Sequence, residues 1–145
     1  MLDWFKRFFL RPGAAAGSRG ATGEQLAADF LRRERGFAVV VRNWRAPRDR
    51  RAELDLVCRD GEVLVFVEVK TRTAGALVPG YYTVDARKKR ALLRVCAAYL
   101  ARLAVKPRTF RFDVVEVALP ADPAGGAPEV RHLENIPLFP KHYGG

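Results

Sequence analysis

The sequence has little sulfur and little imidazole, which argues against several kinds of site. Its 145 residues include two cysteines, one methionine and two histidines. Cys58 and Cys96 have neither CxxC spacing nor a neighbouring histidine cluster. This pattern argues against a disulfide framework and a zinc site, and predicts two buried, reduced thiols in a cytoplasmic protein.

Long apolar runs are also missing. No run approaches the roughly 18 residues that a membrane-spanning helix needs, and Asp3, Lys6 and Arg7 interrupt the first ten residues, so we expect neither a membrane span nor a signal peptide. The chain has no glycine-rich nucleotide loop, internal repeat or Ser-His-Asp order. These absences leave a cytoplasmic α/β protein whose chemistry depends on carboxylates and bases.

Positive charge is abundant. Lys and Arg total 26 against 16 Asp and Glu, a net charge of +10 that favours polyanionic partners such as nucleic acid. With 49% hydrophobic residues, the chain is expected to form one domain. We predict an extension and flexible linker over 1–19, an α/β domain over 20–136 and a tail over 137–145.

Residues 53–70 place charged groups inside two apolar, β-branched runs. Asp60-Gly61 between these runs predicts a β-hairpin with a two-residue loop. Such a loop gives the opposed pairs Val57–Leu64, Asp55–Phe66 and Glu53–Glu68. Asp55 and Glu68 then become diagonal neighbours, roughly 7–8 Å apart at the backbone, on the same face as Lys70.

Carboxylates forced together in a partly buried place repel one another, so they need a proton, a cation or a basic partner. Hard oxygen ligands on rigid strands suit Mg²⁺, or Mn²⁺ in its place. We expect Asp55 and Glu68 to hold the metal together with the main-chain carbonyl of Val69. Lys70 would then lie beside a phosphate oxygen or a nucleophilic water. Glu53 is expected to act behind the ligands or to pair with an arginine.

The first helix is predicted over 22–34, with Thr22 as its N-cap, Gln25 completing a capping box and Gly36 ending it. Glu24 lies in its first turn on the side of the core. Two interpretations of Glu24 stay open: a favourable charge at the helix N-terminus and an accessory acid of the site.

A strand over 37–42 leads into a basic loop over 43–51, which forms a candidate phosphate-binding rim. Trp44 in this loop either stacks on a base or fills the edge of the core. A loop over 73–80 is a candidate gate. A helix over 84–103 carries a basic N-terminal half and a predicted buried stripe formed by Ala91, Leu92, Val95, Cys96, Tyr99 and Leu103. Strands over 109–118 and 130–133 complete a mixed sheet of about five strands flanked by helices.

Asp55, followed after twelve residues by Glu68-Val69-Lys70, resembles the PD-(D/E)xK nuclease superfamily. Over about 20–135, the chain is similar to its YraN-like family, UPF0102. The matching segments are Gly23-Glu24, Arg42-Asn43, Ala52 to Leu56, Phe66 to Arg72, Lys88 or Lys89, and Arg111 to Val115. Ala52 departs from the family pattern, which has glycine there; a methyl group would distort the strand entry if the backbone needed a positive φ.

The resemblance implies a restriction-endonuclease-like fold and a Mg²⁺-dependent endonuclease. It makes Glu24 an accessory acid that acts through water, and places Lys88 or Lys89 near the nucleic-acid backbone. Archaeal-type Holliday-junction resolvases belong to the same superfamily, so branched DNA is a candidate substrate by analogy. The predicted site comprises catalytic Asp55, Glu68, Lys70 and Glu24, and nucleic-acid contacts from Arg42, Asn43, Arg45, Arg72, Lys88 and Lys89.

Two other classes of function stay open at this point. A nucleic-acid-binding module on the same scaffold would bind without cleaving, and a basic structural protein would bind no metal. Cleavage of both strands of a symmetric junction would require two sites, which makes a homodimer one expected assembly.

Overall fold

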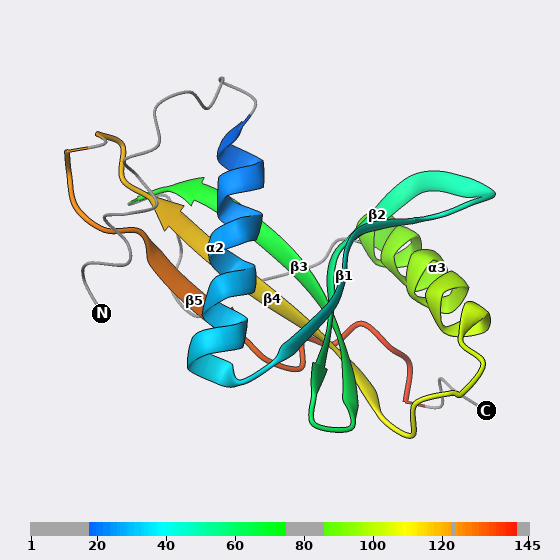
Figure 1. Cartoon of the computed structure of the whole chain (residues 1–145). Coiled ribbons are helices and arrows are strands. Elements are labelled where there is room, and N and C mark those ends of the chain that lie inside the picture. Colours follow the sequence, from blue (N-terminus) through cyan, green and yellow to red (C-terminus); the bar gives the residue numbers. More distant parts are fainter. Residues whose placement is uncertain (1–17, 75–85, 123, 142–145) are drawn as a thin grey trace.

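The computed structural model describes residues 18–74, 86–122 and 124–141, which form a five-stranded mixed sheet with a helix on each face (Figure 1). The helices are α2 (Ser18–Arg35) and α3 (Ala86–Arg102). The strands are β1 (Ala38–Ala46), β2 (Asp49–Asp60), β3 (Val63–Thr73), β4 (Phe110–Leu119) and β5 (Glu129–Leu133). The predicted α/β class with a mixed sheet is confirmed.

The strands follow the order of the sequence, β1-β2-β3-β4-β5. All neighbours are antiparallel except β3 and β4, which run parallel along ten paired positions from Leu64↔Phe110 to Thr73↔Leu119. A parallel pair needs a long crossover, and α3 lies in the segment that joins these two strands. In this order β3 is the central strand of the sheet, so Glu68 and Lys70 lie on the central strand.

The sheet is buried on both faces because its side chains alternate. One face packs against α2 through Leu56, Cys58, Val65, Val67, Val115 and Val117. The other packs against α3 through Val57, Leu64, Phe66, Phe112 and Val114. Four of the predicted apolar positions of α3 are buried, namely Leu92, Val95, Cys96 and Tyr99. Leu138 is also fully buried on this face, so the packing continues beyond residue 136.

The hairpin between β2 and β3 forms as predicted, but its turn lies one residue further along. The closing pair is Asp60↔Val63, and Gly61 takes the positive φ of +58°. Every opposed pair is therefore offset by two residues from the predicted register, which leaves each side chain on its predicted face because strands alternate with period two. The last pair is Leu56↔Val67, so the next residues along are Asp55 and Glu68.

The predicted basic loop over 43–51 is wrong, because β1 continues to Ala46 and β2 begins at Asp49. A two-residue turn, Pro47-Arg48, joins them. Asn43 has a φ of +51°, which bends β1. After this bend, the apolar side chains Trp44 and Leu54 pack on the α3 side. Figure 1 shows this end of the hairpin passing alongside α3.

Helix α2 begins at Ser18, so Thr22 lies inside the helix and is not its N-cap. A side chain on Gly23 would clash with Thr71 Oγ1 of β3, so helix and strand cross closely at this glycine. The predicted C-terminus is confirmed: Arg35 is the last helical residue and Gly36 has a φ of +71°.

His132, which is expected on sequence grounds to be a surface or edge residue, is buried in the structure. Its Nε2 lies 2.8 Å from Asp113 Oδ2, and both side chains have 0% exposure. Asp113 also accepts hydrogen bonds from Arg111 Nε and the main-chain N–H of Asn135. These partners compensate for the burial of the carboxylate and hold its pKa below the ordinary range.

Both cysteines are free and buried, and burial raises the pKa of the Cys58 thiol to about 12. Among the described helices, none has the length and hydropathy to cross a bilayer. Residues 1–17 of the predicted extension over 1–19, and residues 75–80 of the predicted gate over 73–80, lie outside the described residues.

Candidate metal and nucleic-acid site

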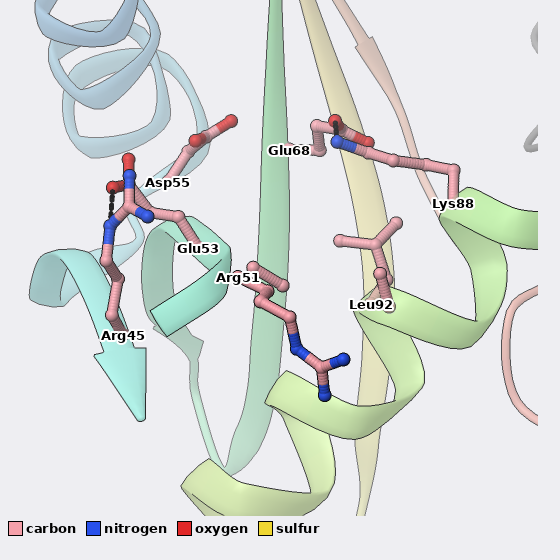
Figure 2. Close-up of a pocket in the computed structure, with 9 residues that line it drawn as sticks. Arg45, Arg51, Glu53, Asp55, Glu68, Lys88 and Leu92 are labelled. Atoms are coloured by element: carbon pink, nitrogen blue, oxygen red, sulfur yellow. Dashed lines mark hydrogen bonds and ion pairs between the residues drawn. The ribbon is translucent and has the colours of Figure 1, made fainter. Parts of the chain in front are cut away.

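Four elements meet where β2 separates from β3. Helix α2 brings Glu24, β2 brings Glu53 and Asp55, β3 brings Glu68 and Lys70, and α3 brings Lys88. Figure 2 shows Glu53 and Asp55 on one side of the pocket between these elements and Glu68 on the other side, where Lys88 of α3 reaches Glu68. The predicted hairpin thus brings its acids to one place, together with residues that are distant in sequence.

Three carboxylates form a compact cluster. One oxygen each from Glu24, Glu53 and Asp55 lies within 4.8 Å of the others. With its amide nitrogen turned toward these acids, Asn43 donates to Glu24 Oε2 at 2.9 Å and to Glu53 Oε1 at 3.2 Å. The bend in β1 therefore places a donor between two acids. Glu53, expected behind the ligands, lies among the clustered acids.

Asp55 occupies the position where the β2–β3 ladder ends. The main-chain N–H of Val69 donates to Asp55 Oδ2 at 2.8 Å, which fixes the carboxylate between the two strands. Burial raises the pKa of Asp55 to about 6, and repulsion from Glu24, Glu68 and Glu53 adds to the shift, while the Val69 hydrogen bond opposes it. Near neutral pH this carboxylate is ionised at a cost, which a cation would relieve.

Glu24 shares this environment. Its pKa is raised by burial and by the charge of Glu53, and lowered by the Asn43 hydrogen bond and the Arg42 charge. Arg42 Nη1 donates to Gln25 Oε1 at 2.6 Å, and Gln25 Nε2 donates in turn to Asp29 Oδ1. Gln25 therefore links α2 to β1, and the predicted capping box does not form.

Glu68 is held by lysines from two elements. Its side chain is 7% exposed, and its Oε1 lies 3.2 Å from Lys70 Nζ and 2.9 Å from Lys88 Nζ. Lys70 is on the face predicted for it, and Lys88 is the lysine of the predicted pair that reaches the site. The positive charges compensate for the burial of this carboxylate.

A cavity of about 270 Å³ lies beside these groups. Glu53, Asp55, Glu68 and Lys88 line its acidic and cationic part, and the remaining lining residues are Arg45, Arg51, Ala52, Ala91 and Leu92. Ala52 contributes its methyl group to this wall. The positive φ values of non-glycine residues in the described part of the chain fall at Asn43 and Asn135, so Ala52 does not distort the strand.

The structure places the remaining predicted residues at different distances from the acids. Arg45 Nε donates to Glu53 Oε2 at 2.8 Å and Arg45 Nη1 to the carbonyl of Arg50, so Arg45, like Arg42 and Asn43, holds the site together from within. Lys89 does not line the cavity. Arg72 is exposed further along β3. Contact of these residues with nucleic acid stays a prediction, as does the role of the Val69 carbonyl.

Sequence reasoning missed Leu92 and Ala91 as lining residues and Gln25 as a linker, and it gave Arg51 only as part of the basic rim over 43–51. Leu92 and Ala91 follow the apolar spacing of α3, which signals a core and gives no hint of a cavity. The continuation of β1 to Ala46, which turns Arg51 toward α3, depends on the bend at Asn43. Asn in the middle of an apolar strand was the available signal, because Asn tolerates positive φ.

The donor set fits a hard divalent cation. Carboxylate oxygens on strands and a helix are the ligands that Mg²⁺ and Mn²⁺ take. The pKa values of Asp55 and Glu24 are raised, first by burial and then by the neighbouring acids, so ionising both carboxylates is unfavourable unless a cation lies beside them. Asp55, Glu53 and Glu24 are therefore the residues best placed to hold the ion, with Glu68 across the cavity.

Comparisons with known proteins point to one family. The family model described as "Uncharacterised protein family UPF0102" matches residues 23–117. A UPF0102 protein of Symbiobacterium thermophilum is 48% identical over 98 residues, which cover 68% of this chain and 80% of the relative. UPF0102 proteins of Beutenbergia cavernae and Geobacter metallireducens are 44% and 36% identical, each over 81% of this chain and 93% and 90% of their own lengths. The matched region contains all the acids of the site.

Proposed function

The chain belongs to protein family UPF0102, and from the site it carries we propose that it is a metal-dependent endonuclease-like enzyme that hydrolyses phosphodiester bonds in nucleic acid. The observation that carries this proposal is the convergence of Glu24, Glu53 and Asp55 within 4.8 Å, beside Glu68 and its two lysines. Acids that could share a cation, next to two lysine ammonium groups, suit the transfer of an anionic phosphoryl group.

Bound at these acids, Mg²⁺ or Mn²⁺ would polarise the scissile phosphate and lower the pKa of a water. Asp55 is the central ligand, because the Val69 N–H fixes its carboxylate and leaves the other oxygen available. Hydrogen bonds from Asn43 hold the carboxylates of Glu24 and Glu53 near Asp55.

Lys70 follows Glu68 on β3 and supplies a positive charge beside its carboxylate. Its ammonium group can orient the attacking water and stabilise the negative charge that develops on the phosphate. Lys88 reaches the same carboxylate from α3 and is placed to bind the neighbouring backbone phosphate. The order Asp55, Glu68, Lys70 is the arrangement that resembles the PD-(D/E)xK nucleases, and that resemblance makes four-way DNA a substrate to test.

A cleavage assay tests this proposal. Labelled single-stranded, duplex and four-way DNA are incubated with the full chain in Mg²⁺, Mn²⁺ or EDTA. We expect cleavage in either metal, loss in EDTA, and at least a hundredfold loss for Asp55→Asn and Lys70→Ala. The exposed residues Asp122 and Lys141 provide matched controls, because Asp122→Asn and Lys141→Ala remove the same groups elsewhere. Equal activity of Asp55→Asn and wild type would contradict the proposal.

A nucleic-acid-binding module without chemistry is the second candidate. The ion pairs of Glu68 favour it, because Lys70 and Lys88 already neutralise this carboxylate without a metal. This candidate predicts salt-sensitive binding of the same oligonucleotides with no cleavage in Mg²⁺ or Mn²⁺. The cleavage assay and a binding measurement on the same samples separate the two.

A further inference from the structure

The cavity beside the acids has two chemically distinct parts. Glu53, Asp55, Glu68 and Lys88 form the charged part, where a metal and a phosphate would lie. Ala52 and Ala91 with Leu92 form an apolar part, which adjoins the guanidinium-bearing residues Arg45 and Arg51. Figure 2 shows Leu92 projecting from α3 in the region between Glu68 and the guanidinium of Arg51.

The volume exceeds what the charged part alone requires. At about 30 Å³ for each water in the liquid, a cavity of about 270 Å³ corresponds to roughly nine waters. That is more than one phosphate group occupies and far less than a duplex. The cavity therefore has room for one further unit of a nucleic-acid chain beside a phosphate.

The arginines are held so that they can form a wall. Arg51 Nε and Nη2 donate to the two oxygens of Asp49, each at 2.8 Å, and Arg45 is fixed between Glu53 and the carbonyl of Arg50. In-plane hydrogen bonds hold a guanidinium while leaving its flat faces available. Nucleic-acid bases stack on such faces and on apolar side chains.

We infer that the cavity receives the base of one unpaired nucleotide adjacent to the scissile phosphate, so that the substrate of the proposed nuclease is single-stranded or locally unpaired nucleic acid. This inference rests on the proposed function for the position of the phosphate. A base in a continuous duplex would first have to leave its stack, which costs a few kcal/mol and disfavours intact duplex.

Binding measurements in Ca²⁺ test the inference without requiring cleavage. Fluorescence anisotropy is followed for a labelled 12-mer single strand, a duplex of the same sequence, and a duplex with a one-nucleotide bulge. We expect the single strand and the bulged duplex to bind at least tenfold more tightly than the intact duplex. Ala91→Leu fills the apolar part from α3, and should lower affinity for the first two ligands at least tenfold while leaving duplex affinity unchanged.

Ala97→Leu is the matched control, because Ala97 is exposed on the same helix. Circular dichroism and Mn²⁺ calorimetry establish that Ala91→Leu folds and keeps the metal. A wild-type protein that binds intact duplex as tightly as single strand would overturn the inference, as would an Ala91→Leu protein that is folded and binds single strand normally. Failure of the proposed function would instead appear as normal binding without cleavage in Mg²⁺ or Mn²⁺.

Discussion

At the scale of single residues, Asp55 links the stability of the fold to the chemistry of the site. Its pKa is raised from 3.8 to about 6 by burial and by the neighbouring acids. Between about pH 4 and pH 6, the folded protein binds a proton that the unfolded chain has released. The contribution of Asp55 to the free energy of unfolding therefore falls as the pH rises through this window, and this loss is complete above it.

Asp55→Asn should remove this loss, because the amide carries no charge and its oxygen can still accept the Val69 N–H. We expect the variant to be more stable than wild type by about 3 kcal/mol at pH 7.5, because the pKa rises from 3.8 to about 6 and one pKa unit corresponds to ~1.4 kcal/mol. The two proteins should converge near pH 4. Urea denaturation in EDTA at several pH values measures this, and a wild-type protein more stable than Asp55→Asn at pH 7.5 would contradict it.

Gly23 is a second residue with a specific role, because it allows α2 to cross β3 at Thr71. Gly23→Ala adds a methyl group onto Thr71 Oγ1. The β-branched Thr71 has little rotamer freedom with which to escape. We expect a net loss of about 1–3 kcal/mol of stability despite the better helix propensity of alanine. Thermal unfolding of the single variant and of Gly23→Ala combined with Thr71→Ala should show substantial rescue in the double variant; equal losses in both would argue against this crossing.

At the scale of elements, the bend of β1 at Asn43 shapes the site. Asn43→Gly keeps the positive φ but loses the hydrogen bonds to Glu24 and Glu53. We expect Mn²⁺ affinity to fall about tenfold, the size of effect found when partners that orient metal ligands are removed. Asn43→Ala should lose the same affinity and about 1 kcal/mol more stability than Asn43→Gly, because alanine resists this backbone conformation. Wild-type Mn²⁺ affinity in both variants would show that Asn43 does not orient the acids.

The elements also show how much of the structure can be predicted from the sequence alone. Alternation around Asp60-Gly61 was enough to predict the β2–β3 hairpin and the face of Asp55, Glu68 and Lys70, because a turn shifted by one residue offsets opposed pairs by two. The helical spacing of Leu92, Val95 and Tyr99 likewise predicted the buried stripe of α3. The start of α2 at Ser18 and the continuation of β1 to Ala46 escaped prediction, because the capping preference of Thr22 and the basic, proline-containing stretch over 43–51 indicated other boundaries.

At the scale of the whole molecule, the acids lie in a protein with a net charge of +10. Basic side chains on the β1–β2 hairpin and on α3 flank the cavity, and Arg94 of α3 also approaches Asp49 of the hairpin at 3.8 Å. This distribution places negative charge at the clustered acids and positive charge around them, as the proposed site for a polyanion requires.

Binding of nucleic acid should therefore weaken steeply with salt. For single-stranded DNA, the slope of log affinity against log salt is about −0.7 for each phosphate neutralised. We expect Arg94→Ala to reduce the slope by roughly that amount. Arg108→Ala, which removes an exposed arginine from the segment between α3 and β4, should leave it unchanged. Anisotropy titrations between low and moderate salt measure both slopes, and identical slopes for wild type and Arg94→Ala would exclude a phosphate contact at Arg94.

The central claim is that Asp55 and its neighbouring acids share one divalent cation. Titration of the full chain with Mn²⁺ by isothermal calorimetry at pH 7.5 tests it most directly, with Asp55→Asn and the exposed-site control Asp122→Asn beside the wild type. We expect one Mn²⁺ per chain for the wild type and for Asp122→Asn, and at least a hundredfold weaker binding for Asp55→Asn. Absence of binding to the wild type, or equal binding to Asp55→Asn, would contradict it.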